Sequence, residues 1–465
     1  MAEYVVLKFG GSSQCKEGTQ TMLNKIKQYL QENMKIIMVI SAVGKTTNML
    51  YDIVNGEYDK FNIVYDNHKK FCESINVNFD ILSDIFENLR QDINDLHKPF
   101  VDILQKKIKI ISYGENISSM IIHNFLINQS IENNLINAHN YIKNKNTSEN
   151  INNETFNLKG EFYCDDKLLN YLTNFKDVLV FVTQGFIAST SDGKYCILTR
   201  SGSNTSASLI ASLINAKRLE IWTDVCGLYT YDPRKIKNAK VIPFIKYSIC
   251  QEAAAMGSQV VHPYSIRPCE KKKIPIYIKN TFDIDNVGSV INCNGPLKIK
   301  NCLNNLNPDS CNDFNEETNK IYLIACQKNV TLFEIESIDM WDGYGFVGDI
   351  FKVFNDEQID VSIITTSQFS IMTTTSEKSQ SKIINTECIL KKKFDVKISK
   401  CCVVSVIADD VIHNEIIKQS FSKIPEIFNI RMMHYSSNNT TLSYVVEEDR
   451  CDDFVEILHD VYFKN

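Results

Sequence analysis

Apolar and polar positions divide the first forty or so residues into a strand, a helix and a second strand. Residues 4–9 are rich in β-forming types, and residues 35–43 form a nearly continuous apolar run. Between them, apolar residues recur at the spacing of one helix face: Met22, Leu23, Ile26, Tyr29 and Leu30. An uninterrupted apolar strand is typical of a parallel sheet that is covered on both faces. The pattern therefore predicts a βαβ unit and an α/β fold.

Similar strand patterns recur in "IKIISYG", "VLVFVTQGF" and "RLEIWTDV". After Ile321 the segments shorten and alternate as β, α, β and then β, α, β, β, α, which indicates two small ferredoxin-like α+β units. We expect a large domain at 1–293, a linker at 294–319 and smaller domains at 320–396 and 397–465, with interleaving of the last two left open. The asparagine-rich stretch 132–157 is expected to be a surface insertion without an assignable role.

Length and composition narrow the possible functions. A chain of 465 residues is long enough for two or three domains. Its formal net charge of −6 argues against a strongly basic nucleic-acid-binding surface. No run reaches the roughly 18 apolar residues of a membrane helix, and no signal-peptide pattern is present. The 15 cysteines include no Cys-x-x-Cys pair, so we expect reduced thiols in the cytoplasm, no disulfide framework and no metal site.

The end of the first strand carries the first candidate chemistry. Lys8 closes an apolar run and is followed by Gly10, Gly11 and Ser12. Adjacent glycines let backbone N–H groups approach an anion, and a following helix contributes its positive N-terminus. A tight turn with an exposed lysine explains this stretch equally well when it is taken alone.

A second glycine-containing stretch, Gly44-Lys45-Thr46, matches only the end of a phosphate-binding P-loop. The P-loop pattern requires a glycine five residues before Gly44, where this chain has Val39. A β-branched residue cannot form that loop, so we do not expect a P-loop nucleotide site.

Polar side chains follow several of the later strands. They include Glu115, Phe186 with its neighbouring glycine, Arg200, Thr223, Asp224, Tyr229 and Arg234. In an open parallel sheet, ligands bind beyond the carboxyl ends of the strands. Each residue alone also fits an ordinary packing or surface role, but the whole set predicts one crevice for anionic ligands.

The order of these motifs resembles aspartate kinase over nearly the whole chain. The matching blocks are "KFGGSS", "SAVGKTTN", "SYGENISS", "VTQGFIAS", "TRSGSN", "WTDVCGLYTYDPR", "EAAAMGSQVVHPYSIRP" and "IPIYIKNTF". The later stretch "GFVGDIFKVFNDEQIDVSIITTS" resembles the first of that family's two ACT regulatory domains. The resemblance implies an amino-acid-kinase αβα sandwich with a mainly parallel sheet, followed by two ferredoxin-like ACT domains. It also implies a monofunctional enzyme that forms a homodimer or homotetramer through the ACT domains.

The implied reaction is transfer of the γ-phosphoryl group of MgATP to the β-carboxylate of L-aspartate, the first step of lysine, threonine and methionine synthesis. By resemblance, Lys8 contacts the transferred phosphate, and Gly10, Gly11 and Ser12 surround phosphate oxygens. The implied aspartate site is Thr47, Glu115, Phe186, Arg200 and Ser203. The implied nucleotide site adds Thr223, Asp224, Tyr229, Arg234 and Gln259. No nucleic-acid or membrane partner is implied.

The chain departs from the family pattern in the loop Thr199-Arg200-Ser201-Gly202-Ser203-Asn204. Two family glycines are larger here, and Asn204 replaces an aspartate that organises the catalytic end of the site. The resemblance assigns catalysis to Lys8 and Asn204, and the lost charge predicts a slower enzyme. Gln259 stands where many members have a nucleotide-contacting lysine.

The predicted effector site also differs from that of lysine-sensing members. By resemblance it comprises Met340, Gly345, Phe346, Asp349, Ser362 and Gln368. Ser362 and Gln368 stand where those members carry carboxylates, so we expect weak lysine inhibition, with a neutral amino acid such as threonine, or no effector, as the alternative. Two other functions remain open: a catalytically impaired relative that binds amino acids, and a kinase for another acyl acceptor.

Overall fold

The computed structural model describes residues 3–175, 177–199, 201–258, 261–293, 320–337, 344–422, 424 and 428–464. The predicted site residues Arg200, Gln259 and Met340 lie outside these ranges. The chain forms two compact units. Unit 1 comprises Met1–Leu228, Val241–Cys250 and Val260–Phe314, and unit 2 comprises Tyr229–Lys240, Gln251–Gln259 and Asn315–Asn465. The domain limits expected from the sequence stay a prediction.

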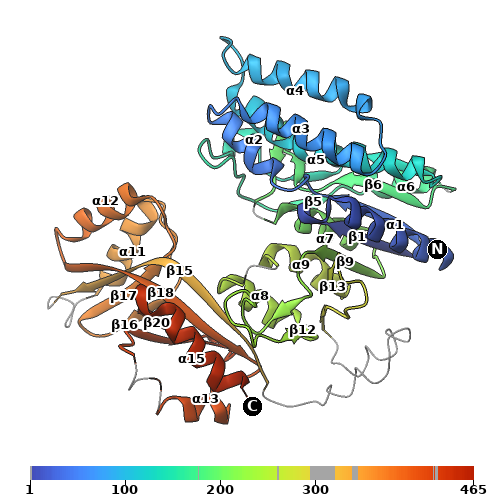
Figure 1. The fold of residues 1–465 in the computed structure, drawn as a ribbon. Coiled ribbons are helices and arrows are strands. Elements are labelled where there is room, and N and C mark those ends of the chain that lie inside the picture. Colours follow the sequence, from blue (N-terminus) through green and yellow to red (C-terminus); the bar gives the residue numbers. More distant parts are fainter. Residues whose placement is uncertain are drawn as a thin grey trace. The chain divides into compact units, whose positions relative to one another are not determined.

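Unit 1 is built on an eight-stranded sheet with the strand order β12-β14-β13-β9-β1-β2-β6-β3. Figure 1 labels β1, β6, β9, β12 and β13 among these strands. Its strands are β1 (Tyr4–Phe9), β2 (Lys35–Ile40), β3 (Asn133–Ile136), β6 (Val180–Gln184), β9 (Arg218–Thr223), β12 (Phe244–Lys246), β13 (Ile276–Asn280) and β14 (Ser289–Asn292). All neighbours pair in parallel except β13 and β14. The mainly parallel α/β fold is therefore confirmed.

Helices follow these strands along the chain, and the helix Tyr247–Ala255 begins in unit 1 and ends in unit 2. They are α1 (Lys16–Gln31), α2 (Thr46–Val54), α3 (Lys60–Ser74), α4 (Ser83–Asp95), α5 (Ile103–Asn128), α6 (Lys167–Asn174), α7 (Gly202–Leu213), α8 (Tyr247–Ala255) and α9 (Pro263–Lys272). α7 packs on β1, β2 and β9, while α5 packs on β2, β3 and β6. Every residue of β2 is buried, as expected for a strand with both faces covered.

The asparagine-rich stretch is not a surface insertion, so that expectation was wrong. It supplies β3 to the large sheet and β4 (Ile142–Asn144) to a second sheet with β5 (Phe162–Cys164), β7 (Ile187–Ser189) and β8 (Tyr195–Ile197). Its apolar side chains, including Ile136, Ile142 and Phe156, are buried. The asparagines instead form local turns; the Asn152 side-chain oxygen, for example, accepts hydrogen bonds from the N–H groups of Glu154 and Thr155.

Unit 2 contains a six-stranded antiparallel sheet with the order β16-β17-β15-β18-β20-β19. Its strands are β15 (Ile321–Glu336), β16 (Ile364–Thr366), β17 (Ser370–Thr375), β18 (Asp395–Ala408), β19 (Met432–Tyr435) and β20 (Thr441–Glu447). Its helices are α11 (Phe346–Asp356), α12 (Gln380–Leu390), α13 (Glu415–Ser420) and α15 (Cys451–Phe463). The short strands β10 (Leu228–Tyr229) and β11 (Val241–Ile242) lie where the chain passes from one unit to the other and back.

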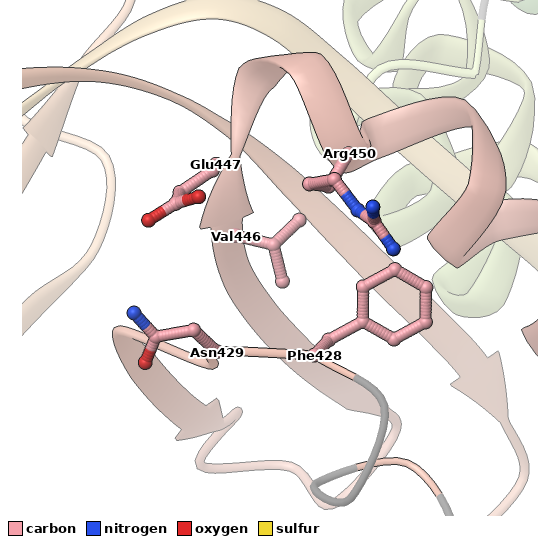
Figure 2. Close-up of a pocket in the computed structure, with 5 residues that line it drawn as sticks. All are labelled: Phe428, Asn429, Val446, Glu447 and Arg450. Atoms are coloured by element: carbon pink, nitrogen blue, oxygen red, sulfur yellow. The ribbon is translucent and has the colours of Figure 1, made fainter.

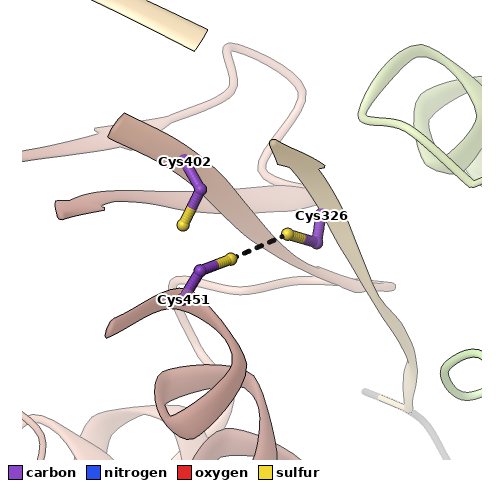
Figure 3. A group of neighbouring side chains, drawn as sticks. All are labelled: Cys326, Cys402 and Cys451. Carbon is purple, nitrogen blue, oxygen red and sulfur yellow. Dashed lines mark hydrogen bonds between the residues drawn. The ribbon is translucent and has the colours of Figure 1, made fainter. Parts of the chain in front are cut away.

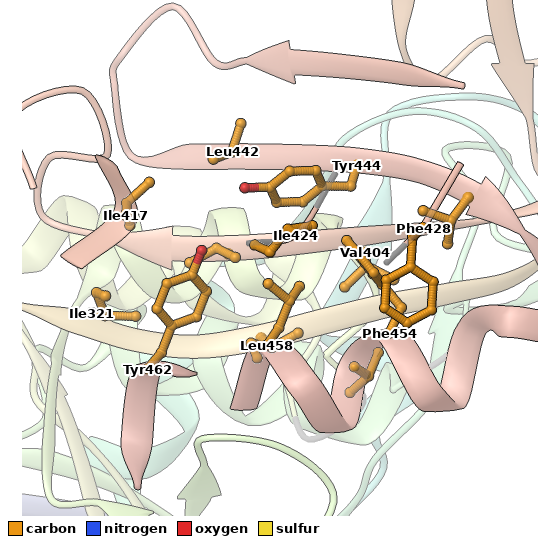
Figure 4. Close-up of a cluster of buried hydrophobic side chains, with 14 of the residues drawn as sticks. Ile321, Val404, Ile417, Ile424, Phe428, Leu442, Tyr444, Phe454, Leu458 and Tyr462 are labelled. Atoms are coloured by element: carbon orange, nitrogen blue, oxygen red, sulfur yellow. The ribbon is translucent and has the colours of Figure 1, made fainter. Parts of the chain in front are cut away.

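The two long central strands of unit 2 each contribute to separate hydrophobic cores. One core includes Ile321, Val404 and Phe454, beneath α15 (Figure 4). The other includes Phe333, Ile350 and Val396, beneath α11 and α12. The two α+β halves therefore share one continuous sheet, in agreement with the expected ferredoxin-like class. Across the described ranges, no helix has the length and apolar character needed to span a membrane.

Candidate active site

The carboxyl end of β1 presents a lysine beside a glycine turn. β1 lies between β2 and β9, with Lys8 opposite Val39 and Ile221. The Lys8 side chain is buried, and its Nζ lies 3.4 Å from where a Cβ on Gly10 would be. A Cβ on Gly11 would lie 2.7 Å from the carbonyl oxygens of both Ala42 and Gly44, so only glycine fits. The Gly44 N–H also donates to the Gly11 carbonyl at 3.0 Å, which ties the loops after β1 and β2 together.

Two carboxylates lie within electrostatic reach of Lys8. Burial lowers the pKa of the Lys8 ammonium to about 8, and the charges of Asp224 and Glu115 oppose that shift. Burial raises the pKa of the Glu115 carboxyl to about 8, opposed by the Ala42 N–H, the Thr47 hydroxyl and the Lys8 charge. The structure thus brings together four of the predicted site residues, from β1, the loop and helix after β2, α5 and the end of β9.

The loop after β2 therefore does have a role, although not that of a P-loop. Its Ala42 N–H and Thr47 hydroxyl bond to Glu115, and its Val43 N–H donates to the Ser118 hydroxyl of α5 at 3.0 Å. Gly114 leaves room for this approach, since a Cβ there would lie 2.9 Å from the Ala42 Cβ. The loop holds the buried carboxylate in place.

The first turn of α7 packs tightly against the turn after β6. A Cβ on Gly185 would lie 2.5 Å from the Ser203 Cβ, and one on Gly202 would lie 2.7 Å from the Phe186 ring. The Phe186 N–H donates to the Ser206 hydroxyl at 3.0 Å. Phe186 and Ser203 therefore belong to one assembly at the N-terminus of α7, a helix that packs on β1.

One departure from the family pattern places a serine, Ser201, in a backbone conformation that favours glycine. Ser201 precedes α7 with a φ of 61°, in the left-handed region that glycine adopts without steric penalty. Asn204, in the first turn of α7, is buried, and its side-chain oxygen has no hydrogen-bond partner within the described part of the chain. The same is true of Glu115 Oε2. Buried acceptors of this kind are normally satisfied, so both fit a site that receives a hydrogen-bond donor from a ligand.

The end of β9 is joined to the end of β1. The Gly10 N–H donates to the Trp222 carbonyl at 3.1 Å, and Trp222 stacks on Phe9 with a centroid distance of 5.8 Å. The Thr223 hydroxyl donates to the exposed carboxylate of Asp224 at 3.0 Å. Thr223 and Asp224 thus extend the group that contains Lys8.

Sequence reasoning missed Gln14, which directly follows the glycine turn. Its side chain is buried, and neither its amide nitrogen nor its oxygen has a partner among the residues described. The signal available in the sequence was its position next to "GGSS". Ser12, by contrast, is exposed at the turn η1 (Gly11–Ser13).

The remaining described candidates belong to unit 2. Tyr229 and Arg234 belong to unit 2, where Arg234 forms an ion pair with Asp232 at 2.9 Å. The described effector candidates also belong to unit 2: Gly345, Phe346, Asp349, Ser362 and Gln368. Asp349 lies 3.5 Å from Lys393, while Ser362 and Gln368 are exposed. Their predicted roles remain predictions.

A hollow of about 280 Å³ lies elsewhere in unit 2 (Figure 2). It is lined by Phe428, Asn429, Val446, Glu447 and Arg450. The Arg450 guanidinium lies 5.3 Å from the centre of the Phe428 ring. The described effector candidates are not among its lining residues, so it does not support the predicted effector site.

Comparison with known proteins places the fold in a family. The model of the amino acid kinase family matches residues 3–280. The chain belongs to the amino acid kinase family. This amino acid kinase is 24% identical to lysine-sensitive aspartokinase 3 of Escherichia coli K12, with all of both chains covered. It is also 24% identical to the chloroplastic aspartokinase 1 of Arabidopsis thaliana, covering 99% of this chain and 80% of the relative.

Solved structures support the same architecture. The structure of E. coli aspartokinase III with aspartate and ADP (R-state) has a TM-score of 0.79 at 23% identity and covers 99% of this amino acid kinase and 100% of that chain. The aspartate kinase of Clostridium acetobutylicum has a TM-score of 0.74 at 23% identity, covering 98% and 100%. The resemblance to aspartate kinase, drawn from the motif order, is thereby confirmed.

Proposed function

We propose that this amino acid kinase transfers the γ-phosphoryl group of ATP to the β-carboxylate of L-aspartate. The observation that carries the proposal is the buried Lys8 near the end of β1, whose ammonium feels the charges of Asp224 and Glu115. Transfer between two anions requires positioning and charge neutralisation more than covalent chemistry. A buried ammonium beside a glycine turn supplies both.

Each reactant has a matching set of residues. Lys8 and the N–H groups of Gly11 and Ser12 bind phosphate oxygens and stabilise the charge that develops during transfer. Gly10, whose own N–H bonds to Trp222, leaves the space beside the Lys8 ammonium open for the phosphate. Glu115 accepts hydrogen bonds from the aspartate ammonium through its unpartnered oxygen. The aspartate is held by Thr47, Phe186, Ser203 and Arg200. The Arg200 guanidinium would bind a substrate carboxylate through two parallel hydrogen bonds. In unit 1, Thr223 and Asp224 contact the nucleotide, while the nucleotide-binding roles of Tyr229, Arg234 and Gln259 stay predictions from the resemblance.

A magnesium ion fits this proposal. Mg²⁺ in kinases is held mainly by substrate phosphates and one or two carboxylates. Asp224 is an exposed carboxylate, hydrogen-bonded by Thr223 and close enough to Lys8 to act on its charge. The ion would neutralise phosphate charge when it enters with ATP, and Asp224 would orient it.

A catalytically impaired relative is the second candidate, and Asn204 is the observation that favours it. The amide keeps the shape of a carboxylate but cannot balance the charge of Lys8. Loss of one charge-assisted hydrogen bond corresponds to about 1.5–3 kcal/mol, or roughly 10- to 100-fold in rate. Because a loss of this size slows phosphoryl transfer without abolishing it, we propose that this chain is a slow enzyme rather than an inactive relative.

A hydroxylamine assay tests the proposal. Purified protein, MgATP and L-aspartate are incubated with hydroxylamine, which converts the acyl phosphate into aspartyl hydroxamate. We expect product from the wild type, none from Lys8→Ala, and a kcat of Asn204→Asp that is equal or up to about 100-fold higher. Product from Asn204→Asp alone would establish the impaired relative. Product with another carboxylic acid but not with aspartate would establish a different acceptor.

We further propose that an amino acid regulates the enzyme through unit 2. The enzyme would serve lysine, threonine and methionine synthesis. It would form a homodimer or homotetramer through unit 2. The E. coli relative is named lysine-sensitive and was solved with lysine and aspartate in its T-state. Here Ser362 and Gln368 are uncharged, which supports weaker lysine binding or a neutral effector. Sedimentation analysis would measure the assembly. The cytoplasmic location stays a prediction.

A further inference from the structure

Three cysteine side chains from three elements of unit 2 point toward one another (Figure 3). Cys326 lies on β15, Cys402 on β18, and Cys451 is the first residue of α15. Their sulfur atoms all lie within 4.8 Å of one another, and the Sγ atoms of Cys326 and Cys451 are 3.2 Å apart. Among the described His, Cys, Asp and Glu residues, this is the one group of three with such close ligand atoms.

The fold explains why residues so distant in sequence converge. β15 and β18 are antiparallel, with Cys326 opposite Val404. Cys402 is two positions from Val404 and therefore lies diagonally across from Cys326 on the same sheet face. Cys402 and Cys451 both belong to the core that α15 covers. The strand pairing becomes irregular between Gln327 and Val330, directly after Cys326.

The geometry is close to that of a metal bound by three thiolates. With metal–sulfur bonds of about 2.3 Å, three sulfur ligands of one ion lie about 4 Å apart. The spacing between Cys326 and Cys451 is 3.2 Å and the other two spacings are at most 4.8 Å, so shifts of about 1 Å or less would suffice. Cys402 and Cys451 are buried, whereas Cys326 is partly exposed and gives an ion a route inward.

We propose that Cys326, Cys402 and Cys451 bind one thiophilic metal ion, Zn²⁺ or Cu⁺. Cu⁺ is satisfied by three sulfur ligands, whereas Zn²⁺ would complete its coordination with a water molecule. Binding replaces the thiol protons, which are released to solvent. The site is independent of the proposed kinase reaction. The bound ion would cross-link β15, β18 and α15 and stabilise the core that they share.

Metal titration of the full-length, reduced, metal-free protein tests this site. Zn²⁺ is added in competition with a chromophoric chelator, and Cu⁺ is added without oxygen in competition with a Cu⁺ chelator. We expect one ion per chain for at least one metal, proton release on binding, a higher melting temperature, and three sulfur neighbours by X-ray absorption. The metal bound more tightly identifies the ion.

Variants decide whether these three sulfurs are the ligands. Cys402→Ser and Cys326→Ser should each weaken binding at least about 100-fold, in the upper range for a lost contact at a metal site. Cys401→Ser is the matched control, because Cys401 is adjacent and buried but packs in a different core. Cys326→Ala, at the partly exposed position, is a further variant in case Cys402→Ser does not fold, which circular dichroism would reveal.

Several results would overturn the site. They are an absence of binding by the reduced wild type, binding that Cys326→Ser and Cys402→Ser leave unchanged, and equal loss in Cys401→Ser. A Cys326–Cys451 disulfide that forms in air, in a protein whose reduced form takes up neither metal, would mark the group as a redox-sensitive pair instead.

Discussion

Protonation of the Glu115 carboxyl links the proposed active site to the free energy of unfolding. The folded-state pKa of Glu115, about 8, lies above the ordinary value of 4.5 because the carboxyl is buried. The folded chain therefore binds this proton more tightly than the unfolded chain does. The resulting stability is fully present below about pH 4.5 and is lost as the pH rises through about 8.

Replacing Glu115 with glutamine should remove this dependence, because an amide imitates the protonated carboxyl. We expect the unfolding free energy of Glu115→Gln, relative to wild type, to increase steadily between about pH 5 and pH 8. Urea denaturation at several pH values measures it. Glu154→Gln, at an exposed carboxylate of the same unit, is the matched control, and its unfolding free energy should stay within about 0.5 kcal/mol of the wild-type value. A flat difference for Glu115→Gln would show that the carboxyl is not buried as described.

Among the loops, the contact between the turn after β1 and the turn after β2 determines whether Lys8 and Glu115 can meet. Gly11→Ala would place a Cβ 2.7 Å from two backbone carbonyl oxygens, and neither can move without displacing its loop. We expect hydroxamate formation to fall at least about tenfold, with destabilisation of about 1–3 kcal/mol, as for other overpacked sites. Gly348→Ala, on α11 with open space around it, should leave the melting temperature equal or higher. Normal activity in Gly11→Ala would contradict the close packing of these loops.

Elements with a clear hydrophobic period were predictable from the sequence, whereas long-range neighbours were not. β1, α1 and β2 follow the apolar spacing of their residues because both faces of the sheet are covered. β3 and β4 were mistaken for a surface insertion, since isolated isoleucines among asparagines show no period although they are buried. Asp224 could be placed beside Lys8 because strand ends converge, but the meeting of Cys326, Cys402 and Cys451 depends on strand register, which spacing does not reveal.

At the scale of the whole molecule, the proposed catalytic residues and the proposed effector residues belong to different units. The catalytic candidates Lys8, Glu115 and Asp224 belong to unit 1, and Ser362 and Gln368 belong to unit 2. An effector that binds unit 2 must therefore act by favouring one of two states of the whole chain. Its effect is limited by the difference in its affinity for those states.

Introducing the two carboxylates that lysine-sensing members carry tests whether Ser362 and Gln368 belong to the effector site. Ser362 and Gln368 are exposed, so acidic replacements leave the core intact. Each new contact with a lysine ammonium is worth about 0.2–1 kcal/mol, so the two contacts made by Ser362→Asp with Gln368→Glu should lower the half-inhibitory lysine concentration by up to about thirtyfold. Hydroxamate assays with lysine and threonine measure the response. Ser381→Asp with Gln380→Glu, on α12, adds the same charge away from the predicted site and should leave the response unchanged. Equal responses of the two double variants, or strong lysine inhibition of the wild type, would place the effector elsewhere in the chain.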